Sequence, residues 1–322
     1  LSLPAMLGQG YDRSLAAGTV CGAGTLGILI PPSIMLVIMA DQLALSVGDL
    51  FMGAVFPGLI LGTLYISYIL LRSNLWPESA PLSPDLQEFS WFMMWDVFKS
   101  ILPPVFLILA VLGSIFAGIT TPTEASGVGA LGAILLAAYN HNLNFSVLKE
   151  VTYAAFKTTA YIFAIFLGAT CFALVLRELG GDELVERAIT GLPFGKYGIL
   201  IFILLIVFLL GFLLDWIEIT LIILPLLSPI VDSLGFEIEG FGTMDEPDLI
   251  WFTLLVAVAL QTSFLTPPVG FALFYLKGVC PPEIKMVDIY KGVAPIIILQ
   301  LIGLTLVVLF PTIVTWLPSV AY

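Results

Sequence analysis

Two short stretches that contain Pro-Pro interrupt long apolar segments, and they constrain the fold of this chain more than any other feature. The first is TLGILIPPSI at residues 25–34, inside the apolar run 17–40; the second is TSFLTPPVG at residues 262–270, inside the run 249–276. Proline lacks a backbone N–H and disfavours helix in the residue before it, so each pair predicts a helix broken into two halves. In a membrane such breaks persist only where protein or a watery cavity satisfies them, and paired breaks are typical of a secondary transporter's binding site.

The composition excludes a soluble globular protein and predicts an all-α polytopic membrane protein. Of 322 residues, 60% are hydrophobic and only 11% are charged, and the mean hydropathy is +1.10. A net charge of −12 with 11 Lys+Arg excludes nucleic acid as a partner, which leaves the lipid bilayer as the expected surroundings. Since about 20 apolar residues cross the hydrocarbon core, the expected spans are residues 17–40, 50–71, 101–119, 124–139, 151–176, 249–276 and 293–315.

The two broken spans predict two repeats of the same order. LPAM at residues 3–6 precedes the first Pro-Pro as LPLL at residues 224–227 precedes the second, so each repeat is expected to hold a re-entrant hairpin arm and then a broken span. The predicted segments are 1–72 (hairpin end, broken span 17–40, span 50–71), 73–99 (interfacial linker), 100–176 (scaffold and connecting spans) and 177–322 (hairpin 197–231, broken span 249–276, last span 293–315).

The distribution of charge predicts how the repeats face the membrane. The loop before the last span carries Lys277, Lys285 and Lys291 and is expected in the cytoplasm, whereas residues 232–248 hold six acids and no Lys or Arg. Alternation of the spans then gives the repeats inverted topology and a periplasmic C-terminus. The basic loop 177–196 is the one misfit in this scheme.

A helix broken at mid-membrane presents free carbonyls at one side of the break and free amides at the other. Carbonyls with a few hydroxyls suit a sodium ion, and amides suit an anion. From position alone, the plausible sodium ligands are Thr25, Gly27, Ile30, Ser33, Thr262 and Thr266.

Asp215 and Glu218 lie deep in the apolar block 197–231, at the expected tip of the hairpin. Two carboxylates in such surroundings repel each other unless a cation or proton intervenes, which makes Asp215 the first choice for a cation ligand and Glu218 a weaker one. The alternative is purely structural, with Asp215 as a helix N-cap and Glu218 at the third helical position. The two roles are compatible.

Thr121, Pro122 and Glu124 form a second helix-start signal, a capping box with proline at the first helical position. A structural helix start is favoured here over a direct substrate role for Thr123 or Glu124. Residues 180–192 are interpreted as an amphipathic surface helix.

Taken in order, these motifs resemble the large membrane (M, DctM-like) subunit of tripartite ATP-independent periplasmic (TRAP) transporters. The matching stretches are LPAM with GYD (3–6, 10–12), GTLGILIPPS (24–33), FPG (56–58), TPTEA (121–125), GFLLD (211–215) and FLTPPVG (264–270). Because M subunits of that family begin with a further hairpin, the resemblance implies that the chain is truncated at its N-terminus.

The resemblance implies a multi-pass protein of the bacterial inner membrane that imports small organic acids, driven by sodium, through elevator-type motion. It implies a small membrane (Q) subunit and a periplasmic solute-binding protein as partners, and no cofactor beyond the coupling ion. The sodium contacts it implies lie in residues 27–33 and 262–269, which adds Val269, with Asp215 at the hairpin tip. The candidates for substrate contact are Pro32, Ser33, Gln261 and Pro268.

Two other functions are weighed against this one. An independent sodium/organic-anion symporter would share the architecture and need no binding protein. A membrane-embedded enzyme is disfavoured because no Ser/His or Cys/His pair accompanies the single histidine, His141, and no catalytic residue is expected. Dicarboxylates, sugar acids, keto acids and aromatic acids all remain open as substrates.

Overall fold

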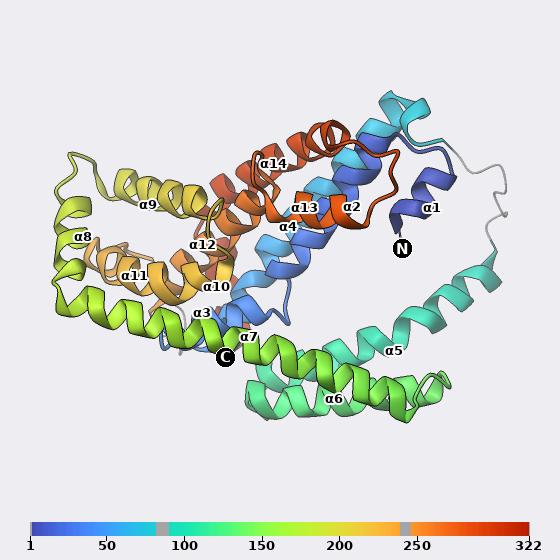
Figure 1. The fold of residues 1–322 in the computed structure, drawn as a ribbon, viewed down its shortest axis with the longest axis horizontal. Helices are drawn as coiled ribbons and strands as arrows, with labels where there is room; N and C mark the ends of the chain where they lie inside the picture. Colours follow the sequence, from blue (N-terminus) through green and yellow to red (C-terminus); the bar gives the residue numbers. More distant parts are fainter. Residues whose placement is uncertain (1, 82–89, 239–245, 322) are drawn as a thin grey trace. The chain divides into compact units, whose positions relative to one another are not determined.

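The computed structural model describes residues 2–81, 90–238 and 246–321, and none of these residues forms a strand (Figure 1). The prediction of an all-α polytopic membrane protein is confirmed. Within the described part of the chain, seven helical segments are long and apolar enough to cross a membrane: Arg13–Gln42, Val47–Leu75, Trp91–Phe116, Phe145–Glu178, Trp216–Ser233, Pro247–Leu265 and Met286–Leu309.

The elements form two compact units, Leu1–Ser83 with Ala169–Val320 and, separately, Pro84–Gly168. We call the first the main unit. The elements in chain order are α1 (Ser2–Gly8), α2 (Arg13–Leu29), α3 (Ile34–Gln42), α4 (Val47–Leu75), the 3-10 turn Pro77–Ser79, α5 (Trp91–Phe116), α6 (Pro122–Tyr139), α7 (Phe145–Glu178), α8 (Gly181–Thr190), α9 (Lys196–Leu210), α10 (Trp216–Glu218), the π-helical turn Ile219–Ile223, α11 (Leu224–Ser233), α12 (Pro247–Leu265), α13 (Phe271–Val279), α14 (Met286–Leu309) and α15 (Thr312–Ala321).

Both predicted helix breaks are present. Residues 30–33 separate α2 from α3, and residues 266–270 separate α12 from α13. In each case a nine-residue helix follows the break, and a long helix, α4 or α14, comes next. The two halves of the main unit therefore repeat the same order of elements around the same proline pair.

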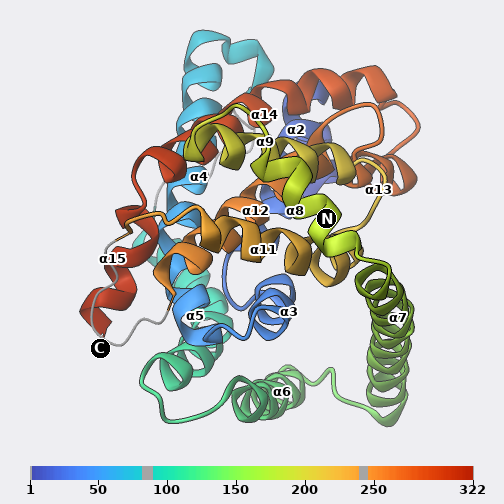
Figure 2. The same ribbon diagram turned by 90° about the vertical axis from the view of Figure 1, so that its left-hand side faces the viewer.

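Helix α12 forms the core of the main unit. Every side chain from Leu249 to Leu265 is buried, and α2, α4, α9, α11 and α14 all pack against this helix. In both views α12 lies between α14 on one side and α11 on the other (Figures 1 and 2). A helix that is apolar on all its faces is shielded from solvent and lipid by its neighbours, as α12 is here.

The predicted hairpin within residues 197–231 is present as two arms around a short turn. The chain runs out along α9, turns at residues 211–215 and returns through α10, the π-helical turn and α11 (Figure 1). Asp215 is the N-cap of α10, as the structural alternative predicted, because its carboxylate accepts a hydrogen bond from the Trp216 N–H at 2.8 Å.

The expected last span, 293–315, is shifted in the structure. Helix α14 starts at Met286 and stops at Leu309, and α15 is a separate helix. Pro311 has no N–H to donate to the Val307 carbonyl, which instead accepts a bond of 2.8 Å from the indole nitrogen of Trp251 on α12.

Two further boundaries differ from expectation. Residues 124–139 lie in α6, which is not among the helices long and apolar enough to span a membrane. The expected linker 73–99 is partly helical: α4 continues to Leu75, and Trp91 and Trp95 lie in α5, whose N-cap is Ser90. The rest of that linker, residues 82–89, and residues 239–245 of the expected acidic segment lie outside the described residues.

The two local helix predictions are confirmed. Thr121 and Glu124 form the capping box at the start of α6, with the Thr121 N–H donating to the Glu124 carboxylate at 2.8 Å. Residues 181–190 form the amphipathic helix α8, where Arg187 pairs with Glu183 at 3.0 Å.

Helices α2 and α14 approach so closely that only glycine fits between them. A Cβ on Gly18 would lie 2.2 Å from the Gly292 carbonyl oxygen, and one on Gly292 would lie 2.0 Å from that of Ser14. We expect Gly18→Ala to lower the free energy of unfolding by about 1–3 kcal/mol, because the added methyl group separates the helices. Thermal unfolding of the purified protein in detergent measures this loss.

Gly24→Ala is the matched control, because Gly24 lies on the same helix with no atom within 4 Å of the position of its Cβ. It should be neutral or slightly stabilising, since alanine favours helix over glycine. Equal unfolding temperatures for the two variants would contradict the close crossing.

Candidate functional site

The first break leaves backbone carbonyls without their helical donors. In a continuous helix the carbonyls of Gly27 and Ile28 would accept hydrogen bonds from the backbone N–H groups four positions on. Those positions are Pro31 and Pro32, which have no N–H. The Ile30 N–H donates to the Leu26 carbonyl at 3.1 Å. The end of α2 therefore presents oxygen atoms at the break, as a cation site requires.

Ser33 joins the two halves of this break. Its hydroxyl donates to the Ile28 carbonyl and accepts the Leu36 N–H at 3.4 Å, which makes Ser33 the N-cap of α3. One of the two freed carbonyls is thereby satisfied. The Gly27 carbonyl is left without a helical donor because the residue four positions on is Pro31, which makes it the strongest backbone ligand candidate at this break.

The second break repeats this chemistry with a different cap. The Thr266 N–H donates to the Ser263 carbonyl at 3.0 Å, and its hydroxyl donates to the Thr262 carbonyl at 2.8 Å. The Phe264 carbonyl is left without its helical donor, because the residue four positions on is Pro268, which has no N–H. Gly270 lies so close that a Cβ there would be 2.7 Å from the Phe264 carbonyl oxygen.

The hairpin tip carries two carboxylates without a cationic partner. Neither Asp215 nor Glu218 takes part in an ion pair of the described residues. Asp215 uses one oxygen for the Trp216 N–H, and Glu218 Oε2 is buried with no hydrogen-bond partner within the described chain. The predicted reciprocal capping by Glu218 does not form, so this carboxylate is left free for another ligand.

The tip lies directly against α12, beside the second break. A Cβ on Gly211 would be 2.2 Å from Ser263 Oγ and 2.9 Å from Ser263 Cβ. Helix α3 packs against the π-helical turn of the hairpin and against α12, and α13 packs against α2. The second half of each broken helix thus contacts the other repeat, and the hairpin tip and both breaks belong to one packed region of the main unit.

The three predicted threonine ligands each donate their hydrogen to a carbonyl of their own helix. Thr25 bonds the Cys21 and Gly22 carbonyls at 3.2 Å, Thr262 bonds Val258 at 2.8 Å, and Thr266 bonds Thr262. A hydroxyl held in this way keeps its lone pairs for a cation. Thr25 and Thr262 are buried, Thr266 and Val269 are half-buried, and Ile30 and Gly27 are exposed.

The four predicted substrate residues occupy two different environments. Pro32 and Pro268 are exposed at the breaks, and Ser33 is buried beside Pro32 as the cap of α3. Gln261 is fully buried, and its amide nitrogen lies 3.5 Å from the hydroxyl of Tyr65 on α4. The breaks therefore offer an accessible surface, whereas Gln261 faces the interior of the main unit.

Sequence reasoning missed three residues that the structure places in this region. Ser263 receives the hairpin tip, Gly270 permits the tight second break, and Gln300 on α14 is fully buried. Gln300 had a visible signal, because an amide inside an apolar span is expensive and needs a reason. Ser263 had none, since its role depends on a contact with the distant Gly211, whereas Gly270 acts locally, against the carbonyls of Phe264 and Thr266.

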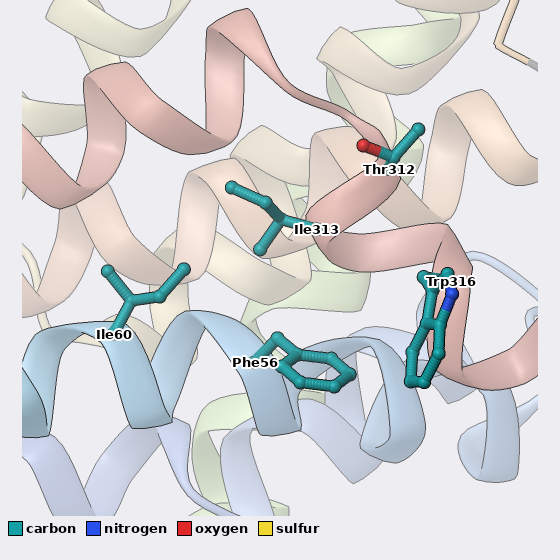
Figure 3. Close-up of a pocket in the computed structure, with 5 residues that line it drawn as sticks. All are labelled: Phe56, Ile60, Thr312, Ile313 and Trp316. Atoms are coloured by element: carbon teal, nitrogen blue, oxygen red, sulfur yellow. The ribbon is translucent and has the colours of Figure 1, made fainter.

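A separate groove between α4 and α15 has a different character. It is lined by Phe56, Ile60, Thr312, Ile313 and Trp316, with the rings of Phe56 and Trp316 edge-to-face at 5.3 Å (Figure 3). No charged side chain lines it. Its chemistry suits an apolar group, so the breaks remain the candidate site for an anion.

Arg13 and Arg72 lie close together at one end of the main unit, which we call the basic end. The Arg13 guanidinium donates to the Glu283 carbonyl at 3.1 Å, and Arg72 pairs with Asp12 at 3.6 Å. Lys196 lies elsewhere, where its ammonium donates to the Gly235 carbonyl at 3.4 Å and lines a pocket with Pro311. Lys196 therefore lies at the same end of the main unit as the start of α15.

The contact between Gly211 and Ser263 can be tested by suppression. We expect Gly211→Ala to lower the unfolding temperature by several degrees, because its methyl group overlaps the Ser263 side chain. Adding Ser263→Gly removes the overlapping atoms and should restore most of the loss. Thermal unfolding of the two single variants and the double variant measures both effects. Losses that simply add would show that the tip does not rest on α12.

Comparison with known proteins gives one consistent family. The family model described as "Tripartite ATP-independent periplasmic transporter, DctM component" matches residues 1–313. The C4-dicarboxylate TRAP transporter large permease protein DctM of Vibrio cholerae is 29% identical over 335 residues, covering 98% of this chain and 70% of that protein. The sialic acid TRAP transporter large permease protein SiaM of the same species is 28% identical over 323 residues, covering 99% and 71%.

A third relative differs in its length. The isethionate TRAP transporter permease protein DctMQ of Oleidesulfovibrio alaskensis is 29% identical over 314 residues, which cover 97% of this chain and 47% of that protein. Together with the all-helical membrane fold and the two broken helices, the match over residues 1–313 shows that the chain belongs to the DctM family of TRAP transporter large permeases.

Proposed function

We propose that this chain is the part of a sodium-coupled, binding-protein-dependent importer of small organic acids that binds the ion and the substrate. The observation that carries the proposal is the hairpin tip, where Asp215 and Glu218 lie without a cationic partner in the described chain. The two carboxylates are half-buried, and a pair of like charges in such surroundings needs a cation or a proton. Backbone carbonyls freed by proline lie in the same packed region.

The proposed sodium ligands come from the two breaks and the tip. Gly27 supplies a carbonyl without a helical donor, and Asp215 supplies charge. Sodium is a hard cation that such oxygen atoms can hold. The full set is Thr25, Gly27, Ile30, Ser33, Asp215, Thr262, Thr266 and Val269.

The proposed substrate site uses the opposite ends of the breaks. The first turns of α3 and α13 carry free amide groups, which attract an anion. Pro32 and Pro268 are exposed there, with Ser33 beside them. Gln261 is buried, so it can reach substrate only after the main unit opens. The relatives named for C4-dicarboxylates, sialic acid and isethionate share an anionic group, and this supports an organic anion as the cargo.

The family and the division of the chain support a proposed mechanism and proposed partners. Both breaks and the hairpin lie in the main unit, which supports an elevator-type motion in which this unit carries the site past a scaffold. A small membrane subunit and a periplasmic solute-binding protein complete the proposed importer. The protein named DctMQ supports the small subunit as a partner.

Transport by the whole permease tests this proposal. We expect uptake of a labelled organic acid into proteoliposomes that contain the permease and its small subunit to require both a sodium gradient and the binding protein. Asp215→Asn should reduce uptake at least tenfold, because the remaining neutral amide cannot balance the ion's charge. Panels of dicarboxylates, sugar acids, keto acids and sulfonates identify the cargo.

Asp41→Asn is the matched control, because it removes the same charge from an exposed position at the end of α3. It should transport like the natural protein. Uptake that needs sodium but no binding protein would favour the independent symporter instead. Uptake by Asp215→Asn at the natural rate would refute the role of the tip carboxylate.

The basic end of the main unit is proposed to face the cytoplasm, since cytoplasmic ends are enriched in Lys and Arg. In a background with Cys21, Cys171 and Cys280 replaced by alanine, we expect Val320→Cys in spheroplasts to react with a membrane-impermeant maleimide. Glu283→Cys, which is exposed beside Arg13, should react only after the membrane is permeabilised. The reverse pattern would invert the proposed orientation and place the C-terminus in the cytoplasm.

A further inference from the structure

An uncharged polar cluster is buried where three helices of the main unit meet. It consists of Tyr65 on α4, Gln261 on α12 and Gln300 on α14, and we call it the amide cluster. Gln261 and Gln300 are 0% exposed and Tyr65 is 5% exposed. The cluster takes no part in the proposed ion site, whose residues face the breaks and the hairpin tip.

The hydrogen bonds within the described chain do not satisfy this cluster. Gln261 Nε2 lies 3.5 Å from Tyr65 Oη, which is long for a hydrogen bond, and the Gln300 amide lies beside the same hydroxyl. Three buried atoms have no partner among the described residues: Gln261 Oε1, Gln300 Oε1 and Gln300 Nε2. Buried amide groups without partners are costly, so the site needs a further group.

The mixture of free donors and acceptors decides which group fits. A cation would bind the amide oxygens but leave Gln300 Nε2 without an acceptor, and no carboxylate of the cluster supplies the charge that a cation needs. An anion would be repelled by the two amide oxygens. Water can donate two hydrogen bonds and accept two, which serves the three unpartnered amide atoms and leaves one lone pair for the Tyr65 hydroxyl.

We propose that a buried water molecule occupies the amide cluster and joins α4, α12 and α14 through Tyr65, Gln261 and Gln300. The water fixes the rotation of α12 about its axis. Gln261 lies five residues before Thr266, so this rotation determines where the carbonyls of the second break point. The site thereby supports the break without contacting the ion.

A structure of the whole permease with its small subunit in nanodiscs, at a resolution near 2 Å, tests the proposal directly. We expect a density within ~2.6–3.2 Å of the three unpartnered amide atoms, the range of ordinary hydrogen bonds. It should persist when sodium is replaced by N-methylglucamine. Direct bonds between the two amides with no density between them would overturn the proposal, and so would a density that disappears without sodium.

Near-isosteric variants give a second readout. We expect Gln300→Met and Gln261→Met each to lower the unfolding midpoint by roughly 3–8 °C, because each leaves its remaining partner unsatisfied. The double variant should lose less than the sum, since both partners of the water are then apolar. Additive losses would contradict a shared ligand.

Thr305→Val is the matched control on the same helix. It removes a hydroxyl of α14 that bonds its own helix at the Leu301 carbonyl, at 2.8 Å. Its midpoint should stay within about 1–2 °C of that of the natural protein, because no buried partner is left unsatisfied.

Discussion

A membrane interior supplies no donor to an unpaired backbone carbonyl, and this constraint governs the whole main unit. The prolines at positions 31, 32, 267 and 268 each remove one helical donor. Some of the freed groups find internal partners, as when the Ser33 hydroxyl bonds Ile28. Others, above all the Gly27 carbonyl, are left without a helical donor. The same missing donor ends α14, where Pro311 frees the Val307 carbonyl and Trp251 takes it.

The second break keeps its geometry because α12, the helix before it, is completely enclosed by its neighbours. With every side chain from Leu249 to Leu265 buried, the helix before the second break has little freedom to shift. The hairpin tip rests on Ser263, and the amide cluster holds Gln261 on another face. The second break, the hairpin tip and the buried polar cluster therefore share one support. A support of this kind holds side chains and backbone groups in a fixed geometry.

The sequence predicted the parts of the fold that depend on local chemistry. Pro-Pro pairs, the capping box at Thr121 and the cap at Asp215 each follow from residues close together in the chain, and the structure contains all of them. The end of α14 was misplaced because the apolar run continues past Pro311, and hydrophobicity alone does not register the missing N–H. The contact between Gly211 and Ser263 joins residues that lie 52 positions apart in the sequence, so no local pattern could reveal it.

The glycine crossing of α2 and α14 has a consequence for how such a protein can move. Backbone touches backbone at Gly18 and Gly292, with no side chain between them to change its rotamer or slide. A shift of one helix by a single residue would drive a neighbouring side chain into the opposing carbonyl. The two helices therefore form a rigid pair, and any displacement of α2 has to carry α14 with it.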